Sequence, residues 1–368
     1  MADNKNIFIF GLEPLDNRYT AQWHTYVPRA LTEARHQRGT PAQIHVIQGE
    51  QTTTQTSQGA FLNFGDTNRW KSSQLVNWLN LFDKGITTPH DVFLFTDTWN
   101  PVILQIRYMS DLMGFDWRIH GIWHAGSYDP SDILGYRMQK PWPWEAERAM
   151  FHACTANWFA TDFHRNMFLK NLQIPEQYHH LARRGGQPHG SIVEHMQQVM
   201  HTDHAPQQGV IWPHRYNADK QPEIAEDLSA SMQQPWCITQ KLQLSKDQYY
   251  HTMASHQVQF SCSLHENLGL GVAESVLANV IPVLPSRCCY REMYHEDFLY
   301  PSEWTQDWNS YQQHKGELMQ FIQFRLDNPQ QFAHQLQQQR QVLCDRYLLA
   351  HDMWNAMLQD VENATKTQ

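Results

Sequence analysis

Short apolar runs alternate along the first half of the chain with longer segments whose apolar residues recur at helical spacing. The short runs predict buried strands, and the longer segments predict helices between them. We expect strands at 6–10, Ala42–Ile47, Asp91–Thr96, Ile119–Trp123 and Trp158–Ala160, and helices at Tyr19–Arg38, Ser72–Phe82, Val102–Met113 and Trp144–His152. Strands that alternate with helices in this way predict a doubly wound parallel sheet in an α/β fold.

The second half of the chain repeats this alternation. We expect strands at Gly209–Trp212, Trp236–Thr239 and Val258–Cys262, helices at Pro222–Met232, Ser245–Ala254 and Val272–Ala278, and a helical stretch over Leu318–Met357 with a break near Asn328-Pro329. The interval 185–208 is rich in Gly, Pro, His and Gln, as linkers often are, and Arg183–Gly190 has the composition of a basic surface loop. We therefore expect domains at 1–205 and 206–345, followed by a C-terminal helix at 346–368.

Length and composition narrow the class of protein. A chain of 368 residues is long enough for two cores of Rossmann size. No apolar run approaches the ~20 residues that span a bilayer, and the N-terminus lacks a basic region followed by an apolar one, so we expect a soluble cytoplasmic protein and no membrane partner. The six cysteines show no CxxC spacing and the 22 histidines are scattered, which predicts neither a disulfide framework nor a metal site.

The charge of the chain is unevenly distributed. The net charge is −9, but residues 1–200 hold 17 Lys and Arg against 18 Asp and Glu, whereas residues 201–368 hold 11 against 19. Affinity for nucleic acid depends on neutralised phosphates. An anionic acceptor is therefore expected to contact the first half.

Two carboxylates, Glu266 and Glu274, flank a glycine-containing turn that follows the strand expected at Val258–Cys262. The carboxyl ends of parallel strands form the edge where open α/β sheets bind ligands. The backbone amides expected to point at an anion on the following helix, such as a nucleotide diphosphate, are those of Asn267, Leu268 and Gly269. In that arrangement Glu274 projects toward a ribose and Glu266 toward a sugar.

A second charged pair follows the strand expected at Gly209–Trp212. Arg215 and Lys220 are five positions apart across a turn, and both can reach one diphosphate. Sugar transfer builds charge on the departing phosphate, and fixed cations stabilise that charge without a metal. The pattern therefore predicts donor binding with no obligatory cofactor, the donor substrate being a nucleoside-diphosphate sugar.

The Glu-x7-Glu spacing resembles that of retaining glycosyltransferases of the GT-B type, which have two Rossmann-like domains facing a cleft. The resemblance implies that the first Glu contacts the donor sugar and the second the ribose, and that the last helix crosses back to the first domain. The motifs Trp-Pro-His-Arg-Tyr-x-x-Asp-Lys-x-Pro-Glu and His-Glu-Asn-Leu-Gly-Leu-Gly-Val-Ala-Glu, within about 209–305, resemble tRNA-queuosine mannosyltransferases. That similarity implies a retaining transferase acting on a hydroxyl group carried by a nucleobase.

The first domain resembles bacteriophage glycosyltransferases that attach glucose or arabinose to 5-hydroxymethylcytosine in DNA. The resemblance implies a uridine-linked donor and a location in the host cytoplasm if the chain is phage-encoded. His124 follows a strand between Trp123 and Ala-Gly, and we expect it to contact the sugar or the acceptor hydroxyl as a second catalytic residue. Exposed aromatic rings would stack a flipped base, and basic side chains would contact phosphates. The expected acceptor-binding residues are Arg18, Tyr128, Trp142, Trp144, Arg183 and Arg184.

Two other functions remain open. The same chemistry could act on a tRNA base or on another small hydroxylated acceptor. A protein of a different class, a non-catalytic nucleotide-sugar or nucleic-acid binding protein, could keep the fold, although it would be expected to lose one of Glu266, Glu274, Arg215 and Lys220. The sequence does not predict an oligomeric state.

Overall fold

The computed structural model describes residues 5–15, 19–52, 63–201 and 208–366, with side chains as far as residue 363. The chain divides into two compact units. Unit 1 comprises residues 1–160, 165–191 and 349–368, and unit 2 comprises residues 161–164 and 192–348. The division therefore falls after Ser191, earlier in the chain than the expected residue 205. Among the described residues, no helix is long and apolar enough to cross a membrane.

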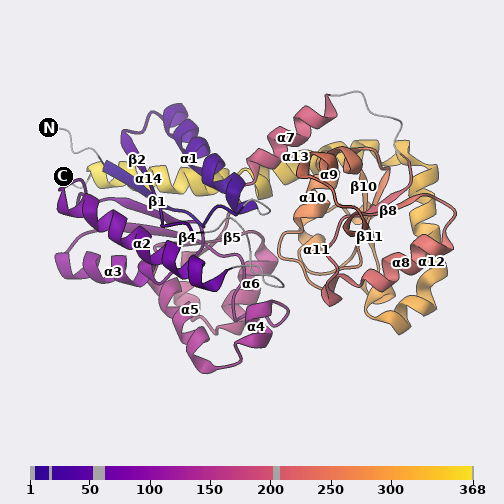
Figure 1. Cartoon of the computed structure of the whole chain (residues 1–368), viewed down its shortest axis with the longest axis horizontal. Coiled ribbons are helices and arrows are strands. Elements are labelled where there is room, and N and C mark those ends of the chain that lie inside the picture. Colours follow the sequence, from indigo (N-terminus) through magenta and orange to yellow (C-terminus); the bar gives the residue numbers. More distant parts are fainter. Residues whose placement is uncertain (1–4, 16–18, 53–62, 202–207, 367–368) are drawn as a thin grey trace. The chain divides into compact units, whose positions relative to one another are not determined.

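Unit 1 is built on a six-stranded sheet with the order β2-β1-β3-β4-β5-β6, in which every neighbouring pair is parallel (Figure 1). Its strands are β1 (Lys5–Phe10), β2 (Ala42–Ile47), β3 (Val92–Phe95), β4 (Arg118–Ile122), β5 (Ala156–Phe159) and β6 (Ala182–Arg184). The strand order reverses between β1 and β3. In a doubly wound sheet this reversal opens a crevice at the carboxyl ends of the strands.

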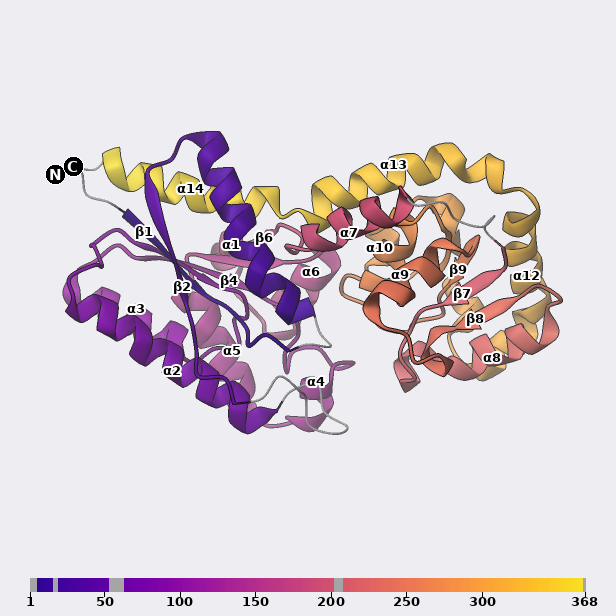
Figure 2. The same ribbon diagram turned by 45° about the horizontal axis from the view of Figure 1, so that its top comes forward.

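Helices cover both faces of this sheet. The helices of unit 1 are α1 (Tyr19–Arg38), α2 (Phe64–Asp83), α3 (Val102–Met113), α4 (Ile133–Arg137), α5 (Pro141–Ala153) and α14 (His351–Lys366). Helices α1 and α14 lie on one face, and α2, α3 and α5 lie on the other (Figure 2). Two further helices, α6 (Asp162–Asn171) and α7 (Gly190–Met200), run across the division between the units.

The two faces of the sheet are packed with different kinds of side chain. Because successive residues of a strand point to opposite faces, Ile7 and Ile9 of β1 lie in one core cluster and Phe8 and Phe10 lie in the other. Strand β3 repeats this separation, with Val92 and Leu94 on the first face and two phenylalanines on the second. The α1/α14 face is therefore mainly aliphatic at the sheet, and the opposite face is aromatic.

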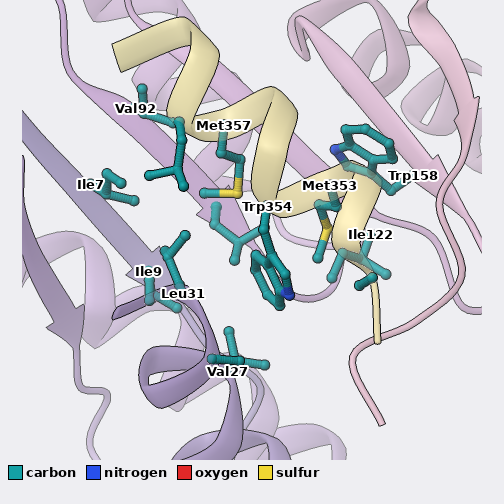
Figure 3. Close-up of a cluster of buried hydrophobic side chains, with 14 of the residues drawn as sticks. Ile7, Ile9, Val27, Leu31, Val92, Ile122, Trp158, Met353, Trp354 and Met357 are labelled. Atoms are coloured by element: carbon teal, nitrogen blue, oxygen red, sulfur yellow. The ribbon is translucent and has the colours of Figure 1, made fainter. Parts of the chain in front are cut away.

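The C-terminal helix α14 is part of the core of unit 1. Met353, Trp354 and Met357 point from α14 onto β1, β3 and β4 (Figure 3). Polar contacts hold the two ends of the chain together, because the Lys5 ammonium donates to the carbonyl of Val361 at 3.1 Å. The C-terminal helix expected at 346–368, which the family resemblance implied would cross back to the first domain, thus includes a segment that completes the hydrophobic core of unit 1.

Unit 2 is built on a five-stranded parallel sheet with the order β11-β10-β9-β7-β8. Its strands are β7 (Val210–Trp212), β8 (Trp236–Ile238), β9 (Val258–Phe260), β10 (Ile281–Pro285) and β11 (Leu299–Tyr300), and its helices are α8 (Pro222–Ser231), α9 (Lys246–Ala254), α10 (Leu270–Leu277), α11 (Tyr290–Met293), α12 (Trp308–Asp327) and α13 (Ala333–Leu343). The strand order reverses between β7 and β9. The α/β fold with parallel sheets expected from the sequence is confirmed.

Most expected elements occur within a few residues of their predicted bounds, and α1 and β2 match them at both ends. Helix α2 begins at Phe64, before the expected Ser72, and the C-terminal helical stretch breaks after Asp327 as predicted. The expectation of a surface loop at Arg183–Gly190 is wrong. Residues 182–184 form the edge strand β6, and residues 185–190 are buried. Gly190 allows this burial, since a Cβ atom there would lie 1.9 Å from the Tyr26 hydroxyl.

The contribution of α14 can be measured by removing its largest core side chain. Trp354 is 3% exposed, and truncation of a buried Trp to Ala leaves a cavity that costs roughly 3–5 kcal/mol. We expect Trp354→Ala to lower the free energy of unfolding in urea by this amount. Asn355→Ala, at an exposed position of the same helix, should change it by less than about 0.5 kcal/mol. Equal stabilities of the two variants would contradict the assignment of α14 to the core.

Candidate functional site

The candidate site of unit 2 lies where the strand order reverses. Strands β7 and β9 are neighbours, and the chain leaves them on opposite sides toward β8 and β10. The segments that follow β7 and β9 therefore flank the crevice expected at the carboxyl edge of the sheet. They carry His214 and Lys220 after β7, and Ser263 and Glu266 after β9.

A buried ion pair between Lys220 and Glu266 is the central feature of this site. The Lys220 ammonium is 2.8 Å from the Glu266 carboxylate and 2.9 Å from that of Asp219. It also donates to the carbonyl of His265 at 2.6 Å. Lys220 is only 6% exposed, so its charge is compensated by these oxygens more than by water.

Burial and charge act in opposite directions on this pair. Burial alone would raise the pKa of Glu266, but the Lys220 ammonium and the neighbouring His214 lower it below its ordinary value. Burial alone would lower the pKa of Lys220, but Glu266 and Asp219 outweigh that effect and raise it. Both groups are therefore charged at neutral pH. The sequence motif identified Lys220 and Glu266 but gave no indication that they bind each other.

His214 is a third member of the site, and the sequence analysis did not single it out. Its Nδ1 atom lies 4.0 Å from the Glu266 carboxylate, and the imidazole is 6% exposed. Burial lowers the pKa of His214 from 6.5 to about 4, despite the favourable charge of Glu266. The imidazole is therefore neutral at physiological pH. Its position directly before Arg215 was the available sequence signal.

The turn between Glu266 and α10 leads into the helix N-terminus at which the sequence predicts an anion. Gly269 adopts the left-handed conformation with φ of 71° and caps α10, which starts at Leu270, two residues before the expected Val272. A Cβ atom at Gly269 would also lie 3.0 Å from the ring of Tyr290. Among the described residues, the amides of Leu268 and Gly269 have no hydrogen-bond acceptor. They remain available to a ligand at the helix N-terminus.

Glu274 lies in the second turn of α10 and is buried. The hydroxyl groups of Tyr249 and Tyr250 each donate to its carboxylate at 3.1 Å. Burial raises the pKa of Glu274, while Lys246 and the two tyrosines act in the opposite direction. The two tyrosines, which the sequence analysis did not identify, fix the orientation of this carboxylate. Each carboxylate oxygen keeps a lone pair, so the expected contact with a ribose stays a prediction.

Arg215 differs from Lys220, the other predicted diphosphate ligand. Its side chain is exposed, and among the described residues no hydrogen bond or ion pair is formed by its guanidinium. The two cations are thus in contrasting environments. Lys220 is held by carboxylates, and Arg215 has five donors available for a solvent-side anion.

In unit 1, His124 is held by hydrogen bonds to both ring nitrogens. Its Nε2 donates to the carbonyl of Thr96 at 2.6 Å, and its Nδ1 lies 3.0 Å from the Tyr19 hydroxyl. A carbonyl only accepts, so Nε2 carries the proton and Nδ1 accepts from Tyr19. Thr96 also lines a cavity of about 10 Å³ beside α1, which is room for one water-sized sphere. The predicted contact of His124 with a sugar or an acceptor stays a prediction.

A chain of buried polar groups supports His124. The Trp23 indole donates to His189 Nδ1 at 3.1 Å, so the neutral His189 ring donates through Nε2 to Gln187 at 3.1 Å. The Gln187 amide then lies 3.5 Å from His124 Nδ1. Gln187 and His189 come from the segment expected to be a surface loop. Only the folded chain shows that they contact the strand ends.

The predicted acceptor residues have different environments. Trp142 and Trp144, at the start of α5, are 55% and 40% exposed. The expectation that Tyr128 is exposed is wrong, because the ring is 1% exposed and packs edge-on against Trp123 and Phe168. These two neighbours come from the segment directly after β4 and from α6, an arrangement that the sequence could not indicate. Arg18 lies outside the described residues.

Arg183 and Arg184 lie on the edge strand β6. The Arg183 guanidinium lies over the Trp158 ring at 5.6 Å, and its side chain is exposed. Arg184 is 3.9 Å from the Asp352 carboxylate of α14. All six cysteines are free thiols. The described residues contain no group of three or more His, Cys, Asp or Glu side chains that could hold a metal ion.

Comparisons with known proteins identify the fold. The sequence matches no protein-family model and no curated protein. The structure is similar to sucrose-phosphate synthase from Thermosynechococcus elongatus, with 13% identity, 99% of both chains covered and a TM-score of 0.59. It is similar to the catalytic domain of starch synthase IV from Arabidopsis thaliana, solved with ADP and acarbose, with 10% identity, 98% of this chain and 99% of that chain covered and a TM-score of 0.58.

A third similar structure is a UDP-forming α,α-trehalose-phosphate synthase from Burkholderia vietnamiensis. It shares 12% identity over 97% of this chain and 99% of that chain, with a TM-score of 0.57. These structural neighbours are GT-B glycosyltransferases, and the similarity extends over both units. The protein therefore has the GT-B fold that the Glu-x7-Glu resemblance implied.

The buried neutral state of His214 predicts a pH dependence of stability. The unfolded chain binds a proton at His214 below about pH 6.5, whereas the folded chain binds it only near pH 4. Stability therefore falls as the pH drops through this window, and the loss between pH 7 and pH 5 is about 2 kcal/mol. We expect His214→Gln to lose this part of the pH dependence when the free energy of unfolding in urea is measured between pH 7 and pH 5. His201→Gln, at an exposed position, should show the same pH dependence as the wild type. If His214→Gln keeps the wild-type dependence, His214 is not the buried neutral histidine responsible for it.

Proposed function

We propose that the protein is a retaining glycosyltransferase that moves arabinose or glucose from a nucleoside-diphosphate sugar to 5-hydroxymethylcytosine in DNA. The observation that carries this proposal is the Lys220–Glu266 ion pair at the strand reversal of unit 2. It places a fixed cation and an ionised carboxylate together at the ligand-binding edge of a GT-B domain. The ADP-bound and UDP-forming structural neighbours support a nucleotide-sugar donor.

The donor would be bound by unit 2. Arg215 and the amides of the turn at Leu268 and Gly269 would hold the diphosphate. Lys220, whose three N–H groups already bind Glu266, Asp219 and the carbonyl of His265, would contribute its charge. Glu274 would accept hydrogen bonds from the ribose, with its orientation set by Tyr249 and Tyr250. We expect uridine as the base, which follows from the resemblance to the phage enzymes.

The reaction would proceed on one face of the sugar. The bond between the anomeric carbon and the β-phosphate oxygen breaks, and its electron pair stays on that oxygen. The hydroxymethyl oxygen of the acceptor attacks the same face of the anomeric carbon, and the departing phosphate oxygen takes its proton. No protein nucleophile is required, and the product keeps the configuration of the donor.

The charged groups of unit 2 would act on the transition state of this reaction. Negative charge develops on the leaving diphosphate, where Arg215, Lys220 and the turn amides are fixed before the reaction. Positive charge develops at the anomeric carbon, and the ionised Glu266 is suited to orient and stabilise the sugar ring. Because Lys220 keeps Glu266 charged, the two groups would operate as a unit.

The acceptor would be bound by unit 1. Trp142 and Trp144 present exposed aromatic surface suited to stacking a flipped base, which is needed because the hydroxymethyl group of a paired base is not accessible to a deep site. Arg183 and Arg184 would contact phosphates, although Asp352 neutralises part of the charge of Arg184. His124, with its ring fixed by Thr96 and Tyr19, would contact the sugar or the acceptor hydroxyl.

A modified tRNA base is the second candidate acceptor. The motifs around Arg215 and Glu266 support it, because they resemble tRNA-queuosine mannosyltransferases. The donor chemistry would be the same for both acceptors. Transfer of labelled sugar to hydroxymethylated DNA and to tRNA, measured side by side, distinguishes them.

The role of Glu266 is tested by a substitution that removes its charge and keeps its shape. The wild type should transfer sugar from a UDP-sugar to hydroxymethylated DNA, detected by mass spectrometry of the digested DNA. Glu266→Gln should lower turnover by about a hundred- to a thousandfold, the loss typical of one fixed electrostatic group, and should still bind UDP. Glu303→Gln, at an exposed position of unit 2, is the matched control and should retain activity.

Two results would contradict the proposal at different levels. Turnover by Glu266→Gln at the wild-type rate would remove the role of Glu266. A wild-type protein that binds nucleotide sugars and transfers none of them to DNA, tRNA or a small hydroxylated acceptor would instead favour a non-catalytic binding protein.

The contribution of β6 to DNA binding is tested by its salt dependence. Each phosphate contact contributes about 0.9 to the slope of log K against log salt. We expect Arg183→Ala with Arg184→Ala to weaken binding of hydroxymethylated DNA and to reduce the slope by about two. A double variant of Lys84 and Lys170, exposed residues of the same unit, should leave the slope unchanged. If the β6 variant keeps the wild-type slope, these arginines do not contact phosphates.

A further inference from the structure

Two buried side chains at the strand reversal of unit 2 have polar atoms without a partner. Among the described residues, neither His214 Nε2 nor Ser263 Oγ has a hydrogen-bond partner. His214 is 6% exposed and Ser263 is 1% exposed. A buried polar group without a partner is destabilising, because the hydrogen bonds it made with water are not replaced. Such atoms occur elsewhere in the described chain as well, but these two lie at a candidate binding edge, where a ligand could supply the missing partners.

The positions of these two residues connect them with the donor site. His214 follows β7 and Ser263 follows β9, the two strands between which the order of the sheet reverses. The imidazole packs edge-on against Trp212 at 5.4 Å, and its Nδ1 lies 4.0 Å from Glu266. His214 is therefore beside the carboxylate proposed to face the donor sugar.

The protonation of His214 limits the chemistry of its ligand. The imidazole is neutral, because burial lowers its pKa to about 4. The Glu266 carboxylate favours the tautomer with the proton on Nδ1, which leaves Nε2 as a hydrogen-bond acceptor. A phosphate oxygen also accepts and cannot pair with it at neutral pH. A sugar hydroxyl can donate to His214 Nε2 and can both donate to and accept from Ser263 Oγ.

We propose that His214 and Ser263 form a subsite that binds hydroxyl groups of the donor sugar and selects which sugar is transferred. The inference rests on the proposed function and extends it from the class of donor to the groups that recognise its sugar. His214 and Ser263 act on the sugar, whereas Arg215, Lys220 and the turn amides act on the diphosphate. The two sets of residues therefore affect different parts of the same ligand.

Because different residues would contact the sugar and the diphosphate, their effects can be measured separately. Isothermal titration measures the binding of UDP, UDP-glucose and UDP-arabinose to the whole protein, with ADP-glucose and GDP-mannose included for the wild type. For the sugar nucleotide that the wild type prefers, His214→Leu and Ser263→Ala should each weaken binding about three- to tenfold, the value of one hydrogen bond. Binding of the matching nucleoside diphosphate should be unchanged, because its contacts are intact.

Three further variants keep the test informative. His214→Gln has an amide group that can take the place of the imidazole nitrogen, and it should retain more sugar-nucleotide affinity than His214→Leu. Ser275→Ala is the matched control, since this buried serine already donates to the carbonyl of Val272 and should bind like the wild type. Ser263→Ala removes a single atom, so it provides the measurement if His214→Leu does not fold. A double variant that combines Ser263→Ala with His214→Gln should also discriminate less than the wild type between UDP-glucose and its epimer UDP-galactose.

Two outcomes overturn the inference in distinguishable ways. In the first outcome, His214→Leu and Ser263→Ala both weaken binding of the diphosphate and of its sugar conjugate equally, or weaken neither. This result would show that the two residues do not bind the sugar, while the proposed function stands. A folded wild-type protein that binds no nucleotide sugar of the panel would overturn the proposed function, and this inference with it.

Discussion

A buried positive charge sets the arrangement of the candidate site in unit 2. Lys220 is almost inaccessible to water, and an ammonium group in that position is tolerated only when oxygens replace its hydration. Asp219, Glu266 and the carbonyl of His265 supply those oxygens. The pair in turn keeps Glu266 ionised at the carboxyl edge of the sheet, and the same burial keeps His214 neutral beside it. One constraint thus places an anion, a cation and a neutral imidazole within a few residues of one strand reversal.

In unit 1 the main constraint is different, because the sheet has an aliphatic face and an aromatic face and both must be buried. The aliphatic face needs α14 from the far end of the chain, and the aromatic face is covered by α2, α3 and α5. Segment 185–190 packs close to the strand ends because Gly190 has no side chain to collide with Tyr26. Gln187, which accepts from His189, consequently lies 3.5 Å from His124 Nδ1. Thr96 and Tyr19 hold the His124 imidazole in one tautomer. The surroundings of His124 in unit 1 are therefore organised mainly by hydrogen bonds, and the candidate site of unit 2 by a charged pair.

Local patterns predicted most of the fold because they report on local physics. Apolar periodicity gave both ends of α1 and β2, and the alternation of strands and helices gave the parallel sheets. The predictions fail where contacts with residues far away in the sequence determine the local structure or its burial. Arg183–Gly190 has the composition of an exposed loop, yet it forms an edge strand and a buried turn against Trp158 and Tyr26. Tyr128 was expected to be a surface aromatic residue, yet Trp123, which follows β4, and Phe168 of α6 pack against its ring.

The same distinction between local pattern and distant contact applies to the candidate site. The sequence by itself determined that Glu266, Glu274, Arg215 and Lys220 follow strands of one parallel sheet, because strand ends and turn residues are encoded within a few positions of each motif. Only the tertiary structure decided that Lys220 pairs with Glu266, that two tyrosines of α9 orient Glu274, and that His214 and Ser263 are buried without partners. Burial and pairing depend on residues about 25 to 50 positions away, whose contact follows from the order of the strands and from no local pattern.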